Sequence, residues 1–579
     1  MKLIRSFLFL ILLLILGFAC FAGAIPLDQE NFISERFFAG LEACKGNKVT
    51  PVGDVRGGIV PHHMLVGDVI ADFYQKLSLT SKPKTIILIG PNHRNLGSAP
   101  VLSSLADWDT PNGICQSDKK IIRRLISEGG LSLDDKTLSK EHSVSIQVPF
   151  VKKYFPDSLV VPIIVSSSLS RYRSLELGNI LNRCLGPGTL VVASIDFSHY
   201  LSSQQAEQKD RKTMAAIEDW NYPTIFQYGN DHIDSANVLL AFLKIMASEK
   251  ANIIEVLQHT NSGIMFGQEV GGSTSYFSLL FSKPQPDDLI RISLCGDIML
   301  AREIGLSMAR RGPVYPFIEA KYMFQHSQLV FGNLESILSD NPFEFRTDLK
   351  FKAAESSLKG LHYSGINYLG TVNNHSYDFG RKVWDESNSL INRSGITAVS
   401  GEAVVFKRGG TKIALLAFDF TRRRFNEKVV MAKVSSARRK ADIVIVAAHW
   451  GIEYKSKSSA AQQNIAHKMI EAGAQVVVGH HPHVIQEIER YNGGLIFYSL
   501  GNFIFDQFQS DDVKQGLVLN VFCKRGKISF VDIVPIKTFN NQARLAEPYL
   551  RKPILAALAE RSDKALARQI IGGRVIYDD

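Results

Sequence analysis

The chain has 579 residues, of which 45% are hydrophobic and 21% charged, and this length is too great for one hydrophobic core. The composition excludes a disordered chain and a protein with many membrane spans. Lys and Arg number 66 against 56 Asp and Glu, a formal net charge of +10 that permits an anionic partner without requiring one. The six Cys include no CxxC pair, which excludes a disulfide scaffold and a cysteine zinc site.

The first 24 residues have the pattern of a secretory signal. Lys2 and Arg5 precede an apolar run over residues 7–24 that ends in small residues. The pattern predicts export with cleavage before Ile25, or an uncleaved anchor in the inner membrane, because about 20 apolar residues span a bilayer. We therefore expect a protein of the periplasm or cell envelope that meets the membrane only through this segment.

Beyond residue 55, β-branched apolar runs alternate with amphipathic helical stretches, which predicts α/β layers with mostly parallel sheets. Strands are expected over residues 84–88, 159–165, 190–195, 290–294, 443–447, 476–478 and 495–498, and helices over 118–128 and 459–472. A stretch rich in proline and charge separates the two halves. The expected organisation is a signal or anchor at 1–24, an extension at 25–55, a first domain at 56–283, a linker at 284–288, a second domain at 289–545 and a helical tail at 546–579.

Polar residues follow the carboxyl ends of the predicted strands in the first half. In open α/β sheets, ligands bind beyond these strand ends. The candidates are His62, His93, Asp196 and His199. Imidazole and carboxylate suit iron, copper and zinc, and two His with one carboxylate form an open iron site. If their strands are neighbours, these side chains are predicted to share a metal. Otherwise each His is a hydrogen-bonded structural residue.

Four motifs of this half resemble the Memo family, whose bacterial members are called AmmeMemoRadiSam system protein B. They are RGGIVPH at 56–62, GPNH at 90–93, EHS to QVPF at 141–150 and SIDFSHY at 194–200. The resemblance implies a fold like that of class III extradiol dioxygenases. It also implies a metal pocket at His62 and His93, lined by Asp196 and His199, with iron or copper as the candidate metal.

This half departs from the Memo family at one candidate ligand. The Cys of the family falls on Asp234 here. Carboxylate in place of thiolate would shift the metal preference from Cu(I) toward iron, manganese or zinc. The alternative is a site that has gone out of use. Glu141 and His142 support the ligands from outside or cap the following segment.

The second half carries residues suited to phosphoester hydrolysis on two metal ions. That chemistry uses Asp and His to hold the cations, an Asn to position the phosphate and further His at the rim. The sequence supplies these residue types at Asp297, Asn333, Glu335, Asn374, His375, His449, His481 and His483. The alternative is a purely structural role, although so many His would be an unusual filling for a core.

The order of these motifs resembles the CapA family of capsule and poly-gamma-glutamate synthesis proteins. The strings are GDIMLAR at 296–302, NLES at 333–336, NNHSYDFG at 373–380, HWGIEY at 449–454, GHHPH at 479–483 and YSLGNFIFD at 498–506. The family is similar to calcineurin-like metallophosphoesterases, a four-layer α/β sandwich. The resemblance implies a divalent manganese, iron or zinc ion at Asp297, Asn333, Glu335, His449, His481 and His483. It also implies catalytic roles for Asn374, His375 and His449, with His375 as the proton donor.

Two departures bear on this second site. Met299 stands where phosphoesterases have a His, and Asn333 stands where they have a bridging Asp. A neutral amide does not offset the repulsion of two cations. The site therefore binds one metal or uses Glu335 in a rearranged shell.

The sequence thus predicts an exported, two-domain α/β protein that fuses a Memo-like domain to a CapA-like domain. The favoured function is metal-dependent phosphoester hydrolysis linked to capsule or poly-gamma-glutamate synthesis. Its partner would be an anionic cell-envelope polymer or a phosphorylated substrate, and not nucleic acid. Two alternatives stay open: a non-catalytic, metal- or polymer-binding assembly or export factor, and a redox metalloprotein that acts through the Memo-like site.

Overall fold

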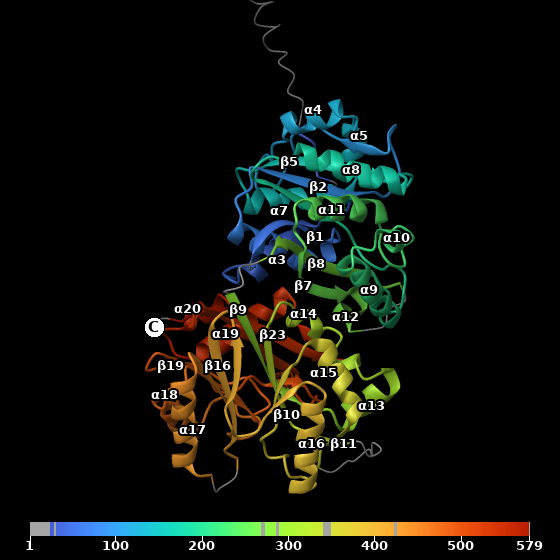
Figure 1. The fold of residues 1–579 in the computed structure, drawn as a ribbon. Coiled ribbons are helices and arrows are strands. Elements are labelled where there is room, and N and C mark those ends of the chain that lie inside the picture. Colours follow the sequence, from blue (N-terminus) through green and yellow to red (C-terminus); the bar gives the residue numbers. More distant parts are fainter. Residues whose placement is uncertain are drawn as a thin grey trace, which may run out of the picture. The chain divides into compact units, whose positions relative to one another are not determined.

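The computed structural model describes residues 24–27, 30–51, 53–267, 272–284, 289–339, 349–421 and 425–577 (Figure 1). The predicted signal or anchor, apart from Ala24, and linker residues 285–288 lie outside this described part. Within it, none of the helices has the length and apolar character needed to cross a membrane. The chain divides into two compact units. Unit 1 contains residues up to 38, 55–254 and 260–283, and unit 2 contains 39–54, 255–259 and 284–579.

The described residues of unit 1 form an eight-stranded sheet in the order β4-β3-β5-β2-β6-β1-β8-β7. Its centre consists of β2 (Thr85–Asn92), β6 (Thr189–Ser194) and β1 (Asp54–Val60), which run parallel. The side chains of β2 are buried throughout, as expected for a parallel strand that is covered on both faces. The other strands are β3 (Val101–Ser103), β4 (Ser132–Leu133), β5 (Leu159–Ser166), β7 (Ile253–Asn261) and β8 (Ser275–Lys283).

Helices and their connections cover this sheet (Figure 1). The predicted helix at 118–128 is α4 (Lys119–Ser127), which begins after Asp118 because that side chain accepts a hydrogen bond from the amide of Ile121. Helices α8 (Arg171–Cys184) and α11 (Ala236–Ser248) pack against each other. The remaining described helices of unit 1 are η1 (Met64–Val66), α3 (Gly67–Thr80), α5 (Asp135–Leu138), α6 (His142–Ser145), α7 (Gln147–Tyr154), α9 (Ser203–Glu218), α10 (Tyr222–Ile225) and α12 (Ser262–Phe266). Helix α2 (Ser34–Cys44) has its first residues in unit 1 and its remainder in unit 2.

Unit 2 contains two large sheets. The first has the order β14-β13-β10-β9-β22-β23-β24, with β21 paired to β9 and β25 to β23, and the second has the order β15-β16-β17-β18-β20-β19. The first sheet contains β9 (Leu289–Ile298), β10 (Leu329–Leu334), β13 (Tyr368–Gly370), β14 (Thr397–Val399), β21 (Asn502–Ile504), β22 (Gln515–Lys524), β23 (Lys527–Phe539), β24 (Gln542–Leu545) and β25 (Arg574–Ile576). The second contains β15 (Val404–Arg408), β16 (Thr411–Asp419), β17 (Ile443–His449), β18 (Val476–His480), β19 (Ile488–Tyr491) and β20 (Gly494–Phe497), and β11 (Ile337–Ser339) pairs separately with β12 (Lys352–Ala354).

The alternation of apolar side chains explains why the two sheets of unit 2 stack. Ile290, Ile292 and Leu294 of β9 share one core with Ile413 and Leu415 of β16, whereas the next β16 residues, Ala414 and Leu416, face a different core. A strand that alternates in this way buries both of its faces.

Helices cover the two outer faces (Figure 1). On the first sheet they are α13 (Arg302–Arg311), α14 (Ala320–Met323), α15 (Leu358–Ser364) and α16 (Arg381–Arg393), and on the second α17 (Glu427–Lys440) and α18 (Ala460–Glu471). Short 3-10 turns lie at η2 (Tyr315–Phe317), η3 (Glu355–Ser357) and η4 (Asp512–Lys514). This is the four-layer α/β sandwich that the sequence predicts. The predicted tail forms α19 (Pro548–Arg561) and α20 (Ala567–Ile571), which contribute to the core between the sheets, and ends in β25.

Candidate metal centres

The carboxyl ends of four strands meet in unit 2. Asp297 at the end of β9 lies in register with Asn333 of β10 in the first sheet. His449 at the end of β17 lies in register with His480 of β18 in the second sheet. Because parallel strands end at a common edge, side chains that are far apart in sequence converge there.

Asp297, Glu335 and His449 form the deeper of two groups that could hold a metal. One ligand atom from each lies within 4.8 Å of the others. Asp297 and Glu335 are fully buried and His449 is 2% exposed. The Nδ2 atom of Asn333 donates to Asp297 Oδ1 at 2.8 Å, and it lies 3.4 Å from Glu335 Oε1 and 3.2 Å from His449 Nδ1. The Asn333 amide therefore touches every member of the group.

The hydrogen bonds of His449 determine which ring nitrogen points inward. Its Nε2–H donates to Asn374 Oδ1 at 2.8 Å, which leaves the Nδ1 lone pair directed at the Asn333 amide and the two carboxylates. Burial lowers the pKa of His449 well below its usual value, and the neighbouring His481 adds to this effect. A neutral imidazole is the form that binds a metal. Asn374 thus orients a candidate ligand.

Glu335 shows that the deeper group fits a cation. Its buried Oε2 has no hydrogen-bond partner among the described residues. Burial raises the pKa of Glu335 well above its usual value, and the charge of Asp297 raises it further. An unpartnered buried carboxylate oxygen costs about 1–3 kcal/mol or more, and a divalent cation at this point would remove that cost.

The second group lies nearer the surface and consists of Glu453, His481 and His483. One ligand atom from each lies within 4.8 Å of the others. His481 is 8% exposed, yet its Nδ1 has no hydrogen-bond partner in the described part of the chain. His483 Nδ1–H donates to Asn502 Oδ1 at 3.0 Å, so its Nε2 carries the lone pair. Burial lowers the pKa of both His side chains, and both are therefore neutral at pH 7.

A cleft of about 560 Å³ opens beside these residues. Asn374, His375, Glu453 and His483 line it together with Arg302, Glu303, Leu349, Phe351, Tyr454, Phe505, Asp506, Gln507 and Gln509. His375 Nδ1–H donates to Asp378 Oδ2 at 2.9 Å, and the His375 ring stacks on Phe351 with centroids 4.0 Å apart. His375 is therefore held at the cleft in one orientation.

Arg302 and Met299 of unit 2 make contacts that explain their positions without a bound ligand. Arg302 donates from Nε to Asp506 Oδ2 at 3.1 Å. Its guanidinium also lies 4.8 Å from the centroid of the Phe351 ring. Met299 is fully buried in the core beneath the helices, and its sulfur accepts a hydrogen bond from the Ala301 amide. Met299 is thus a packing residue and not a replacement ligand.

Three neighbouring strands bring the candidate ligands of unit 1 together. His62 follows β1, His93 follows β2 and Asp196 follows β6, which lies between β1 and β2 in the sheet. His62 Nε2 is 3.7 Å from Asp196 Oδ2, and Asp196 Oδ1 accepts from the His62 amide at 3.0 Å. The His62 and His93 ring centroids are 5.0 Å apart.

Asp234 enters the same group from the loop before α11. Its Oδ2 is 3.3 Å from His62 Nε2 and 3.8 Å from His93 Nε2, and it accepts from the Asp196 amide at 3.1 Å. Its buried Oδ1 has no hydrogen-bond partner among the residues described. Burial raises the pKa of Asp196 well above its usual value, and the charge of Asp234 raises it further. Two crowded carboxyls with a free oxygen also fit a divalent cation.

His142 and Glu141 also contact the ligand group of unit 1. His62, His93 and His142 form a group that could hold a metal, and the His93 and His142 rings stack with centroids 4.3 Å apart. Burial alone would lower the pKa of His93, but hydrogen bonds and charges from Asp234 and Glu141 raise it to about 10. Glu141 Oε1 lies 2.8 Å from His93 Nδ1, which directs Nε2 toward Asp234. His199 lies beside the group and lowers the pKa of His62, after burial and the charges of His93 and His142.

Sequence reasoning missed Glu453 and His142 as candidate ligands. Both lie inside quoted motifs, HWGIEY and EHS, so the signal was present. Their direction toward the other ligands depends on loop conformations that the residue pattern does not specify.

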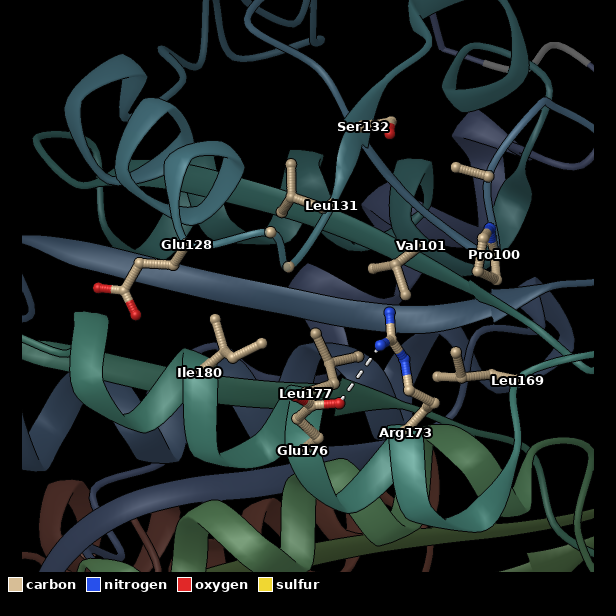
Figure 2. A pocket seen from close by; sticks show the side chains of 13 residues that line it. Pro100, Val101, Glu128, Leu131, Ser132, Leu169, Arg173, Glu176, Leu177 and Ile180 are labelled. Carbon is tan, nitrogen blue, oxygen red and sulfur yellow. Dashed lines mark ion pairs between the residues drawn. The ribbon is translucent and has the colours of Figure 1, made fainter.

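Unit 1 contains a pocket of about 450 Å³ that none of its candidate metal ligands lines (Figure 2). Leu131, Leu177 and Ile180 contribute apolar surface, and Arg173 pairs with Glu176 at 3.5 Å. The predicted site residues are not among its lining residues.

Two family models match different parts of the chain. Residues 33–279 match the family model described as Memo-like protein, and residues 291–507 match that described as bacterial capsule synthesis protein. A PGA biosynthesis protein CapA of Bacillus subtilis is 30% identical over 322 residues, covering 51% of this chain and 84% of the relative. A capsule biosynthesis protein CapA of Bacillus anthracis is 30% identical over 283 residues, covering 44% and 69%. A MEMO1 family protein of Pyrobaculum aerophilum is 31% identical over 239 residues, covering 40% and 84%.

Proposed function

Because the chain belongs to the Memo family through its first unit and to the CapA family of bacterial capsule synthesis proteins through its second, we propose a function for each unit in turn. We propose that unit 2 is a metal-dependent phosphoester hydrolase. One observation carries the proposal. There are two groups of carboxylate and imidazole ligands, Asp297–Glu335–His449 and Glu453–His481–His483. Glu453 and His483 line the same cleft as His375, and the deeper group adjoins this cleft because His449 is hydrogen-bonded to the cleft residue Asn374. Such an arrangement suits the hydrolysis of a phosphoester.

Divalent cations at these positions would lower the pKa of a bound water and polarise a phosphoryl oxygen. The chain itself supplies the proton and the orientation. Asp378 accepts Nδ1–H of His375 and its charge would stabilise the imidazolium form, whose Nε2–H is then the proton that passes to the leaving oxygen. Asn374 holds His449 with its Nδ1 directed inward.

The substrate that we propose is an anionic polymer of the cell envelope or a phosphorylated intermediate in its synthesis. Two relatives carry the names capsule and PGA biosynthesis protein, which supports this choice. The proposal includes export to the periplasm or cell envelope through residues 1–24, because their composition is that of a signal or anchor.

The test uses the full chain after chelation and reloading with Mn²⁺, Fe²⁺ or Zn²⁺. We expect hydrolysis of a chromogenic phosphodiester or monoester that depends on the metal and falls at least about 100-fold in His449→Ala. His467→Ala is the matched control. This partly buried His on α18 pairs with Glu489 on β19, and neither residue lines the cleft. A metal-loaded wild type that hydrolyses neither ester would overturn the proposal and favour the non-catalytic assembly factor.

A second candidate function belongs to unit 1 and is favoured by its donor set. His62, His93 and Asp234 provide two imidazoles and one carboxylate, the combination found in oxygen-activating non-haem iron sites. Iron that is lost in His62→Ala, together with metal-dependent oxygen uptake by the wild type, would support redox chemistry. Oxygen uptake that is unchanged in His62→Ala would exclude it at this site.

A further inference from the structure

The cleft of unit 2 is lined mostly by uncharged side chains. Away from the candidate ligands, its described lining consists of aromatic and apolar side chains, amides and a few charged groups. The uncharged members are Leu349, Phe351, Tyr454, Phe505, Asn374, Gln507 and Gln509. Rings and amides in this mixture suit a molecule that has apolar surface and several hydrogen-bonding groups.

The charged groups of the cleft do not favour a polyanion. Arg302 carries the one guanidinium or ammonium group among the described lining residues. Its Nε donates to Asp506 Oδ2 at 3.1 Å, and a second nitrogen pairs with Oδ1 of the same carboxylate. Glu303 adds an exposed carboxylate to the lining. Because a chain of anionic groups requires free cationic partners, the cleft fits a substrate whose charge is confined to its phosphoryl group.

Tyr454 is held firmly in the wall of the cleft. Its backbone amide donates to the carbonyl of Pro482 at 2.8 Å, and its hydroxyl accepts from Gln507 Nε2 at 3.1 Å. Gln507 in turn accepts from Asn502 Nδ2 at 3.1 Å, and the Asn502 oxygen accepts from His483 Nδ1. This chain of hydrogen bonds fixes the Tyr454 ring relative to a candidate metal ligand.

The Tyr454 ring nevertheless remains accessible. Tyr454 is 48% exposed, although its φ of 63° lies in the left-handed region that non-glycine residues rarely occupy. Trp450 of the same motif is 2% exposed and donates from Nε1 to the Tyr498 carbonyl at 2.8 Å, so it is a packing residue. An exposed aromatic ring that is already immobilised loses little conformational entropy when a ligand packs on it.

A sugar ring has the surface that this cleft would recognise. One face of a sugar presents C–H groups, which pack on an aromatic ring, and its edge presents several hydroxyls. The carboxylate of Glu303 accepts hydrogen bonds only, whereas the Gln509 amide both donates and accepts. Hydroxyls can satisfy both groups, because each hydroxyl also donates and accepts.

We infer that the cleft binds a sugar phosphoester, with the sugar ring packed on Tyr454 and the phosphoryl group at the two ligand groups. This inference rests on the proposed function, because it names the leaving group of the same reaction. In that hydrolysis the oxygen of water bonds to phosphorus, and the bond from phosphorus to the sugar oxygen breaks. The sugar leaves as an alcohol with the proton from His375, and a proton of the attacking water replaces the one that His375 gave.

The experiment measures binding and not turnover. Full-length protein loaded with Mn²⁺ is titrated, in a calorimeter, with a hexose 1-C-phosphonate, in which a methylene replaces the bridging oxygen and prevents hydrolysis. Ethylphosphonate is the ligand without a ring. We expect the hexose phosphonate to bind at least about tenfold more tightly than ethylphosphonate.

Three variants assign this preference to one ring. Tyr454→Ala should lose most of the preference while its affinity for ethylphosphonate stays unchanged, which also shows that the variant has folded. Tyr454→Phe keeps the ring and should keep most of the preference. Tyr549→Ala is the matched control, because Tyr549 on α19 is 44% exposed and does not line the cleft, and it should bind both ligands as the wild type does.

Equal affinities of the wild type for the two phosphonates, or an unchanged preference in Tyr454→Ala, would overturn the inference. Tighter binding of a nucleoside 5′-phosphonate or of polyglutamate than of the hexose phosphonate would overturn it too. Binding that depends on the ring, without hydrolysis of hexose 1-phosphate or of the chromogenic esters, would overturn the proposed function and leave this inference standing. Hydrolysis of a small phosphoester without any preference for a sugar ring would do the reverse.

Discussion

The side-chain amide of Asn333 donates a hydrogen bond to Asp297 Oδ1 over 2.8 Å. The same nitrogen lies 3.4 Å from Glu335 Oε1 and 3.2 Å from His449 Nδ1, so an N–H group points into the group of candidate metal ligands. An amide nitrogen is not a metal ligand. A cation in this group therefore requires Asn333 to turn its oxygen inward.

Replacing this amide should strengthen metal binding. In Asn333→Asp a carboxylate would face the metal without the need to turn, and its charge would offset that of the cations. We expect the Mn²⁺ dissociation constant to fall about tenfold, equivalent to about 1.4 kcal/mol, as measured by isothermal titration calorimetry. An unchanged or weaker affinity would show that the amide does not adjoin the metal.

Glu335 should make the metal-free protein less stable as the pH rises. The unfolded carboxyl titrates near 4.5, whereas burial raises its pKa in the folded state. Its contribution to the free energy of unfolding is therefore complete below about pH 4.5 and is lost as the pH rises toward the raised pKa, by about 1.4 kcal/mol per pH unit.

The measurement is urea unfolding of wild type and Glu335→Gln in chelator between about pH 5 and pH 8. Glu335→Gln lacks the titrating group, so its stability relative to the wild type should increase through this range. Added Mn²⁺ should reverse the difference, because only the wild type has the carboxylate. Parallel pH curves for the two proteins would contradict the prediction.

Asp378 is a positioning residue for His375. In Asp378→Asn the His375 ring keeps its stack on Phe351 but loses the negatively charged acceptor that holds Nδ1–H and stabilises the imidazolium form. We expect kcat for a phosphoester to fall about 10–100-fold, with little change in KM and an altered pH profile. Asp385→Asn is the control, because this exposed carboxylate pairs with Arg381 on α16. A change confined to KM would contradict a role through His375.

Asp234 should determine which metal unit 1 prefers. A thiolate at this position would lie close to His62 and His93, and soft sulfur favours Cu(I) over Fe²⁺. We expect Asp234→Cys to gain affinity for Cu(I) and lose affinity for Fe²⁺, as measured by competition with chromogenic chelators. Equal losses for both metals would indicate that the variant has damaged the site.

Strand positions and candidate ligands follow from local patterns. The predicted strand at 159–165 corresponds to β5 and that at 443–447 to β17, because buried parallel strands are continuous apolar runs. The candidate His and Asp residues follow such runs, so their place at strand ends was predictable. The α18 start at Ser459 was predictable too, because a capping box with Gln462 has a sequence signature.

The amino-acid sequence by itself determined the two α/β units, their family membership and the residue types of both sites, since these depend on apolar periodicity and on motifs that are continuous along the chain. Only the tertiary structure decided that β6 lies between β1 and β2, that Met299 packs in the core, and that Glu453 joins His481 and His483. These facts depend on strand order and on contacts between loops that are distant in sequence. Non-local packing determines such contacts, and the pattern of residues along one segment does not specify them.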